Sequence, residues 1–244
     1  MDGKKVFGKS GWTAFWITLL ISLAVYFYTQ APTVTLEESG ELVVAADHLG
    51  VPHPPGYPLW TVVSWLFTVV FSFVKYRGHP NPAWAVNFVS AVFGAFTCAF
   101  VSLLVARPGL DLIRGVFPDS KKDYSVLRTT CGVCAGLLLA FSPIMWSQSV
   151  IAEVYTLNTF LHILILICAY LWMQDRTKHK YFYWAALMFG LAFTNYQPIV
   201  LIIPALMMVI WFRDRKLFRD CVATLFLAFA LVLFIKVHTS EPAE

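Results

Sequence analysis

The sequence predicts an all-α polytopic membrane protein: about seven transmembrane helices, an N-terminus in the cytoplasm, and one further helix lying in the outer leaflet. Three observations lead to this fold class, namely the composition, the length of the apolar stretches and the distribution of Lys and Arg. Of 244 residues, 59% are hydrophobic and only 13% are charged, whereas about a quarter of a soluble domain is charged. Since a soluble fold could not bury so much apolar surface, lipid must solvate much of it.

Charge and cysteine content exclude several other classes. The net charge is only +4, and no basic run is interleaved with exposed aromatic residues, so no nucleic-acid partner is expected. All five cysteines lie in or beside apolar stretches. Cys131 and Cys134 form a CxxC without histidine or acidic neighbours, and we interpret them as helix-packing residues rather than a redox or metal site.

Eight apolar stretches are long enough, or nearly long enough, to cross a bilayer. The first follows a basic head and has no small-residue cleavage site, so it is expected to remain as an uncleaved span. The eight stretches are 12–30, 57–74, 84–105, 129–145, 155–173, 181–195, 197–212 and 221–237.

The positive-inside rule orients these stretches. Loops poor in Lys and Arg, which we place outside, are 31–56, 146–154 and 195–198. The basic residues that we place in the cytoplasm are Lys4, Lys5, Lys9, Arg107, Arg114, Lys121, Lys122, Arg128, Arg176, Lys178, Lys180, Arg213, Arg215, Lys216 and Arg219.

Eight spans would put the basic loop 106–128 outside and reverse every later loop. The conflict disappears if 57–74, which follows a proline-rich motif and is rich in aromatic residues, lies in the outer leaflet instead of crossing. The alternative is an ordinary span there, with the rule broken in successive loops. Residues 1–244 then form one transmembrane domain, with 31–83 as a first outer loop containing interfacial helices and 84–237 as the remaining spans. A C-terminal soluble region is expected to be missing.

The first outer loop collects the acidic and imidazole side chains Glu37, Glu38, Glu41, Asp47, His48 and His53. Carboxylates crowded at a membrane surface are partly desolvated and repel each other, so such a cluster usually marks function. For Glu37 alone we favour a solvated loop position.

Glu38 and Glu41 are three residues apart, and a helix starting at residue 41 would let both point into one pocket. Residues 42–49 suit a short amphipathic helix on the membrane. A glutamate beside that apolar face could act as a general base for a hydroxyl group, because burial raises its pKa toward neutrality. The string His53-Pro-Pro-Gly-Tyr-Pro58 then predicts a rigid turn that holds a histidine next to these acids.

A second outer segment places Glu153 at the start of a span, where we favour a functional role. Tyr155, Asn158 and His162 follow on one helical face. Polar groups there normally face a cavity or bond neighbouring helices, and for His162 both interpretations stay open. Further groups expected at the same outer cavity are Asn87, Ser90, Gly94, Asn195 and Gln197.

These residues resemble glycosyltransferase family 117, a membrane family of the GT-C superfamily that includes a eukaryotic protein O-mannosyltransferase. In that family an aspartate is expected where Glu38 stands and a histidine where Tyr196 stands. The strings that carry the resemblance are Glu38-Ser-Gly-Glu41, Ala45-Ala46, Leu49-Gly50, His53-Pro-Pro-Gly-Tyr-Pro58, Ala152-Glu-Val-Tyr155, Leu157-Asn158, Gly190-Leu191 and Thr194-Asn195.

The resemblance implies a GT-C-like helical bundle that moves a sugar from a polyprenyl-phosphate donor to a protein or glycan hydroxyl on the non-cytoplasmic side, with inversion. Glu41 or Glu38 would be the general base. No cofactor is expected, although Glu38, Glu41 and Glu153 could bind a divalent cation. The membrane would be a bacterial inner membrane or the endoplasmic reticulum. Expected substrate-binding residues are His53, Tyr57, Arg77, Glu153, Tyr155, Asn158, His162 and Asn195.

Two other functions remain as hypotheses. A non-catalytic subunit of a larger membrane complex could use the same scaffold, which would suit the small loops. A transporter or channel is disfavoured, because the sequence shows no internal repeat and no matched pair of broken helices.

Overall fold

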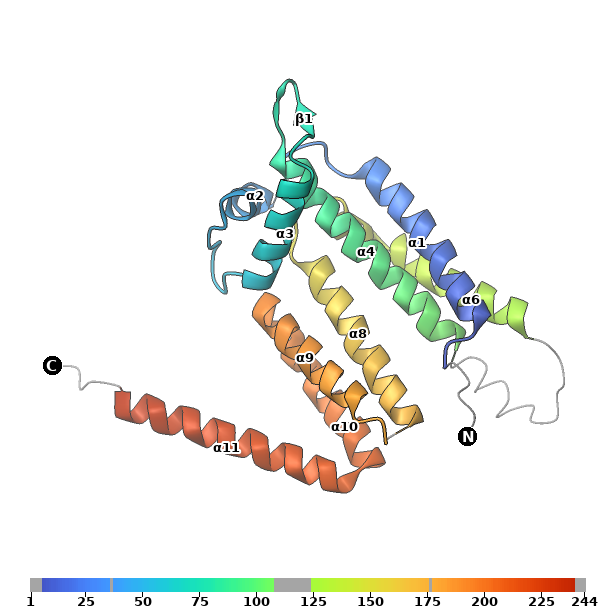
Figure 1. Cartoon of the computed structure of the whole chain (residues 1–244), viewed down its shortest axis with the longest axis vertical. Helices are drawn as coiled ribbons and strands as arrows, with labels where there is room; N and C mark the ends of the chain where they lie inside the picture. The colour runs from blue at the N-terminus through green and yellow to red at the C-terminus, as the bar shows by residue number, and fades with distance from the viewer. Residues whose placement is uncertain (1–5, 36, 108–123, 176, 240–244) are drawn as a thin grey trace.

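The computed structural model describes residues 6–35, 37–107, 124–175 and 177–239, and within them the regular secondary structure is helical apart from one short hairpin (Figure 1). In that hairpin β1 (Lys75–Tyr76) pairs antiparallel with β2 (His79–Pro80). The helices are α1 (Lys9–Thr29), α2 (Ser39–His48), α3 (Pro58–Val70), α4 (Pro82–Ala106), α6 (Ser125–Ala140), α7 (Pro143–Ser149), α8 (Tyr155–Gln174), α9 (Lys180–Asn195), the 3₁₀ helix η1 (Gln197–Ile202), α10 (Ile203–Arg213) and α11 (Arg215–Thr239).

Three of the described helices, α1, α4 and α8, are long and apolar enough to cross a membrane, which makes this an all-α membrane protein. A fourth span is obtained if α6 and α7 are counted together, although the chain bends by 68° between them, just before Pro143. The sequence predicted seven spans. Two of the predicted spans, 181–195 and 197–212, correspond to helical segments shorter than 18 residues, α9 and the η1–α10 pair.

The predicted interfacial stretch 57–74 forms a shorter helix, α3, followed by the hairpin. With 13 residues, α3 is about 20 Å long, well below the hydrocarbon thickness of about 30 Å. Its length therefore does not allow a perpendicular crossing. Pro58 begins the helix, a position where the missing N–H of proline costs nothing.

The centre of the bundle is α4, which packs against α1, α6 and α8. Glycines allow the closest approach: a Cβ on Gly136 of α6 would lie 2.7 Å from Cγ2 of Thr18 and 2.8 Å from the carbonyl of Cys98. Gly132, four residues earlier, meets the backbone of α4 in the same way. Such small-residue spacing is typical of tightly packed membrane helices.

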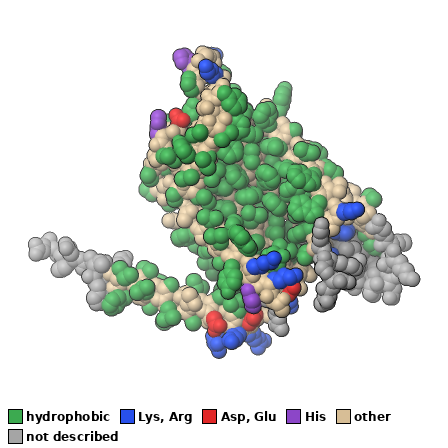
Figure 2. Space-filling model, in the orientation of Figure 1, with side chains coloured by type: hydrophobic (Ala, Val, Ile, Leu, Met, Phe, Trp, Pro, Cys, Tyr) green, Lys and Arg blue, Asp and Glu red, His purple; other side chains and the backbone are tan. Residues whose placement is uncertain are grey.

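The charged side chains separate toward the two ends of the bundle. In Figure 2 most of the visible Lys and Arg side chains lie in the lower part of the bundle, around the junction of α10 and α11 and on the right of the view, while the hairpin carries its own at the opposite end. The basic residues Lys4, Lys5, Arg114, Lys121, Lys122 and Arg176 lie outside the described residues. Helix α11 projects away from the rest of the bundle (Figure 1).

Candidate active site at the hairpin end of the bundle

Two asparagines hydrogen-bond the backbone of the first outer loop: Asn81, just before α4, and Asn87, on α4. The side-chain amide of Asn87 donates to the carbonyls of Ala31 at 2.8 Å and Thr33 at 3.2 Å. That of Asn81 donates to the carbonyl of Pro32 at 2.7 Å. Asn87, which was expected to line the outer cavity, therefore uses its side-chain amide to hold the backbone of the loop.

Helix α2 begins at Ser39, two residues before the predicted start. The hydroxyl of Ser39 accepts the N–H of Thr35 at 3.0 Å and donates to the Thr35 carbonyl at 2.9 Å, which folds the preceding turn onto the helix. Glu38 is the residue before the first turn, and Glu41 follows in that turn. The helix buries one apolar face, formed by Leu42, Val43, Ala45 and Ala46.

Glu41 binds the turn that follows α2. Its Oε1 accepts the backbone N–H of His53 at 2.6 Å, and its Oε2 lies 3.2 Å from Nδ1 of the same residue. Because a carboxylate only accepts hydrogen bonds, Nδ1 must carry the proton in this contact. The Glu41 carboxylate thereby fixes the orientation of the imidazole.

The other imidazole nitrogen faces two further groups. Nε2 of His53 lies 3.0 Å from the hydroxyl of Tyr57 and 3.2 Å from Oε2 of Glu38. The rings of His53 and Tyr57 meet edge to face, with centroids 5.3 Å apart. The predicted association of the turn with both glutamates is thus found, with His53 lying between Glu38 and Glu41.

The turn itself depends on unusual backbone angles. Gly56 has φ +91°, and a Cβ there would come within 3.1 Å of Val51, so only glycine fits without strain. Tyr57 follows with φ +42°, an uncommon conformation for a bulky residue and a typical sign of a constrained site. This backbone aims the Tyr57 hydroxyl at His53.

Glu153 lies between α7 and α8 and is only 4% exposed. Its carbonyl accepts the indole N–H of Trp60 at 3.0 Å and the hydroxyl of Ser90 at 3.2 Å, while Ser90 in turn accepts the Glu153 N–H. Asn195 donates to the next carbonyl, that of Val154, at 3.2 Å. Helices α3, α4 and α9 together hold this acid in place.

The pKa of the Glu153 carboxyl is raised to about 7, first by burial and next by a side-chain hydrogen bond with Glu37. Glu37 is exposed and has φ +63°. The sequence analysis favoured a solvated loop position for Glu37, and the exposure of this residue agrees with that interpretation. The effect of Glu37 on the pKa of Glu153 was not predicted.

Tyr57 and Tyr155 face the same acids. Burial, and then the charge of Glu38, raise the pKa of Tyr57, with Tyr196, Glu153 and Glu41 adding to the effect. The ring of Tyr155 contacts that of Tyr196 edge to face, with centroids 5.3 Å apart. Tyr196 therefore joins the site, although the family pattern had suggested histidine at this position.

The remaining predicted site residues differ in their placement. Asn158 is 9% exposed and its Oδ1 has no partner among the described residues. His162 is half-buried further along α8, and within the described chain no hydrogen bond joins it to the acidic cluster. Arg77 lies exposed at the hairpin, its guanidinium 5.4 Å from the centre of the Tyr76 ring. Neither His162 nor Arg77 is brought into contact with Glu38 or Glu41.

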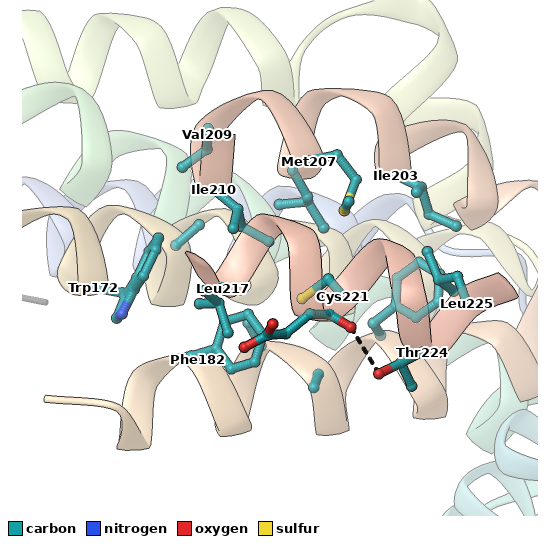
Figure 3. A pocket seen from close by; sticks show the side chains of 16 residues that line it. Trp172, Phe182, Ile203, Met207, Val209, Ile210, Leu217, Cys221, Thr224 and Leu225 are labelled. Carbon is teal, nitrogen blue, oxygen red and sulfur yellow. Dashed lines mark hydrogen bonds between the residues drawn. The ribbon is translucent and has the colours of Figure 1, made fainter. Parts of the chain in front are cut away.

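The described chain has two notable pockets, and only one of them adjoins the acidic residues. One, of about 450 Å³, adjoins α2 and is lined by Glu41 together with His48 and Pro52, so solvent reaches this carboxylate. Another, of about 500 Å³, lies between α8, α9, α10 and α11 and has an almost entirely apolar lining that contains none of the predicted site residues (Figure 3). Among the described residues, no group of three or more His, Cys, Asp or Glu is arranged to hold a metal ion.

Comparison with known proteins gives a consistent assignment. A family model described as the N-terminal domain of protein O-mannosyl-transferase TMEM260 matches residues 38–219. Protein O-mannosyl-transferase TMEM260 of Mus musculus is 30% identical over 226 residues, which cover 88% of this chain and 28% of the mouse protein. The tmem260 protein of Dictyostelium discoideum is 25% identical over 211 residues, 82% of this chain and 23% of its own length.

The chain thus spans about a quarter of the length of these relatives. No solved structure matches it. The matched region begins at Glu38 and includes Glu41, His53, Glu153 and Asn195, so the groups assembled at the hairpin end all fall within it except Glu37. Since the match covers well over half of the sequence, the chain belongs to the family of the TMEM260 protein O-mannosyl-transferase N-terminal domain.

Proposed function

We propose that this chain is the membrane-embedded, sugar-transferring part of a protein O-mannosyltransferase. It would move a mannosyl group from a polyprenyl-phosphate donor to a protein hydroxyl on the non-cytoplasmic side, with inversion at the anomeric carbon. The observation that carries the proposal is the arrangement Glu41–His53–Glu38, in which an oriented imidazole lies between two carboxylates beside a hollow open to solvent.

The geometry gives the two glutamates different roles. Glu41 is engaged by two atoms of His53 and therefore acts as a positioning residue. Glu38 contacts His53 through Oε2, and its side chain is 59% exposed, so Oε1 is available to an acceptor hydroxyl. In an inverting transfer the acceptor oxygen attacks the anomeric carbon, the bond to the phosphate breaks, and the hydroxyl proton passes to a base. Glu38 is our candidate for that base, with the His53 imidazole supporting its charge.

Buried polar atoms near Glu153 suit a hydroxyl-rich ligand. Oδ1 of Asn195, Oδ1 of Asn158 and Oγ1 of Thr156 lie buried without a partner in the described chain. Such atoms are costly unless something donates to them. The hydroxyl groups of a sugar would do so, with the rings of Tyr57 and Tyr155 close by.

The distribution of charges supports the proposed sidedness. The acidic cluster and the hairpin lie at one end of the bundle, and most of the described Lys and Arg side chains visible in Figure 2 lie at the other. If the basic end is cytoplasmic, as is usual, the site faces the opposite side. Lys75 and Arg77, exposed at the hairpin, would then attract the phosphate of a lipid-linked donor.

The proposal is tested by transfer from labelled polyprenyl-phosphate mannose to an acceptor peptide in vesicles that contain the chain. We expect Glu38→Gln to lower the rate by about a hundredfold or more, since general-base catalysis contributes about 10²–10⁴-fold. Asp47→Asn is the matched control in the adjoining helix α2, because within the described part of the chain the ion pair of Asp47 is with its neighbour His48, at 3.9 Å.

Full activity in both Glu38→Gln and Glu41→Gln would reject the assignment. A chain that transfers nothing in any form but co-purifies with fixed membrane partners would instead support the role of a structural subunit.

A further inference from the structure

The larger pocket, between α8, α9, α10 and α11, contains none of the residues assigned to sugar transfer. We propose that this pocket holds one acyl chain of an anionic phospholipid, whose phosphate lies at the basic end of the bundle beside Lys216. This lipid site is separate from the proposed donor site and does not depend on the transfer reaction.

The lining of the pocket suits hydrocarbon better than water. The pocket has a volume of about 500 Å³, which is typical of ligand sites, and its wall is apolar apart from Asp220 and Thr224 of α11. The Thr224 hydroxyl already donates to the Asp220 carbonyl at 2.8 Å, so few polar partners are left for ordered water. An empty pocket would leave its wall without contacts, and the medium around a membrane helix is hydrocarbon.

The pocket is elongated and can follow a hydrocarbon chain. Figure 3 shows Ile210 and Leu217 toward one end of it and Ile203 and Leu225 toward the other. The stretch of α10 between its two lining residues covers about 10 Å of helix axis, and the stretch of α11 covers about 12 Å. One leaflet contains about 15 Å of hydrocarbon, half of the total thickness. The pocket can therefore accommodate most of the depth that one acyl chain spans.

One end of the pocket lies at the junction of α10 and α11, where basic residues gather. Residues 213–220 contain four Arg or Lys residues and two Asp residues, and basic side chains are visible at this junction in Figure 2. The Asp214 carboxylate accepts the N–H groups of Lys216 at 3.0 Å and Leu217 at 3.1 Å. It thereby fixes the start of α11, with Leu217 in the pocket wall and Lys216 exposed beside it.

The acid in the pocket wall is already paired with a base. Nη2 of Arg219 lies 3.1 Å from Oδ1 of Asp220. Arg215 is held at the junction by Trp211, with its guanidinium 5.3 Å from the centre of the indole ring. An excess of positive charge therefore remains at this end of the pocket, and Lys and Arg at a membrane surface attract anionic lipids.

The headgroup rather than the chain must decide which lipid binds. An acyl chain that leaves the bilayer for the pocket exchanges one hydrocarbon environment for another, so its burial alone gives little selectivity. The headgroup, in contrast, meets the excess of positive charge at the junction. The expected ligand is therefore an anionic phospholipid, in preference to a zwitterionic one with the same chains.

The first experiment measures the lipid preference by native mass spectrometry. The delipidated chain in detergent is titrated with phosphatidylglycerol or phosphatidylcholine that have identical acyl chains. We expect one phosphatidylglycerol to bind at least fivefold more tightly, because each Lys or Arg near a membrane surface contributes about fivefold to the binding of anionic lipid. Lys216→Gln should lower this affinity about fivefold. Lys9→Gln, an equal change of charge at an exposed position on α1, should leave it unchanged.

The second experiment examines whether the chain occupies the pocket. Ala185 lines the pocket, so Ala185→Phe should fill it and abolish the bound lipid. Leu187→Phe is the matched control on the same helix, because Leu187 is 50% exposed and lies outside the lining. In the unchanged protein, saturation with phosphatidylglycerol should slow the reaction of Cys221, in the pocket wall, with an apolar maleimide. Cys131, exposed on α6, should react at the same rate with and without lipid.

Lys216 is exposed, so Lys216→Gln keeps the first experiment decisive even if Ala185→Phe fails to fold. Equal binding of the two phospholipids, or unchanged binding in Lys216→Gln, would overturn the proposal. Displacement of phosphatidylglycerol by an equal concentration of polyprenyl-phosphate mannose would overturn it as well, because the pocket would then belong to the chain of the sugar donor. None of these measurements involves sugar transfer, so failure of the proposed function would leave the lipid site standing.

Discussion

Oε1 of Glu41 accepts the backbone N–H of His53 at 2.6 Å, and Oε2 of the same carboxylate lies 3.2 Å from the imidazole Nδ1. Helix α2 and the proline-rich turn are therefore one unit, in which the helix supplies the acid and the turn supplies both donors. Without the Glu41 carboxylate, the backbone N–H and the Nδ1 atom of His53 would both lose the partner they have here.

Removal of the Glu41 carboxylate should loosen the turn. In Glu41→Ala we expect amide hydrogen exchange at His53 to accelerate by about tenfold to a hundredfold, because a hydrogen bond to a charged group contributes about 1.5–3 kcal/mol. Glu41→Gln should show a smaller effect, since its amide oxygen still accepts the backbone N–H. Asp47→Asn serves as control, and equal exchange in all three variants would contradict the role given to Glu41.

Stability should depend on pH through Glu153. Its pKa is raised from 4.5 to about 7 in the folded chain, so the folded state binds the proton more tightly than the unfolded state. The contribution is present in full below pH 4.5 and is lost as the pH rises through about 7. It amounts to at most about 3 kcal/mol. Thermal unfolding in detergent should show a lower Tm on the alkaline side, and Glu153→Gln should reduce that slope.

Gly136→Ala should destabilise the bundle. The added methyl group would meet the Cys98 carbonyl at 2.8 Å, and a backbone atom cannot move aside easily. Overpacking of this kind costs about 1–3 kcal/mol. Gly190→Ala is the matched control in another helix, because nothing lies within 4 Å of a Cβ there. A lower Tm for Gly136→Ala, with an unchanged or higher Tm for Gly190→Ala, is the expected pair of results.

Trp60→Phe should displace Glu153 while keeping most of the apolar contact. Trp60 is fully buried and its indole donates to the Glu153 carbonyl at 3.0 Å. Loss of the donor leaves that carbonyl with Ser90 alone and should cost about 1–2 kcal/mol. Trp184→Phe, at a position 53% exposed, is the control. Transfer activity and Tm should both fall in Trp60→Phe, and an effect no larger than in the control would remove Trp60 from the support of the site.

The acidic group of Glu38, Glu41 and His53 could be found in the sequence because its members lie close together along the chain. Glu41 and His53 lie in one loop; a short amphipathic helix lies between them, and three prolines and a glycine follow within five residues of His53. Their partner Glu38 was found for the same reason. The effect of Glu37 on the pKa of Glu153 could not be found in this way, because the two residues are 116 positions apart along the chain.

The all-α membrane class was predicted correctly, but the lengths and boundaries of several helices were not. Apolar length identified α1, α4 and α8 directly, but it treated 129–145 as one span where the chain bends by 68° before Pro143, and 181–195 and 197–212 as full spans. Hydrophobicity reports which residues avoid water, not whether they do so against lipid or against other helices. The distances of Arg77 and His162 from the two glutamates could not be predicted either, because residue type and sidedness do not specify distance.

By itself, the sequence determined that the chain is an apolar helical bundle, that its first outer loop carries acids and a constrained turn, and which family those motifs resemble. Tertiary structure alone decided that α3, α4 and α9 converge on the backbone around Glu153 and that this acid is buried. The reason is physical: composition and motif are properties of neighbouring residues, whereas burial arises only when distant helices pack and exclude water.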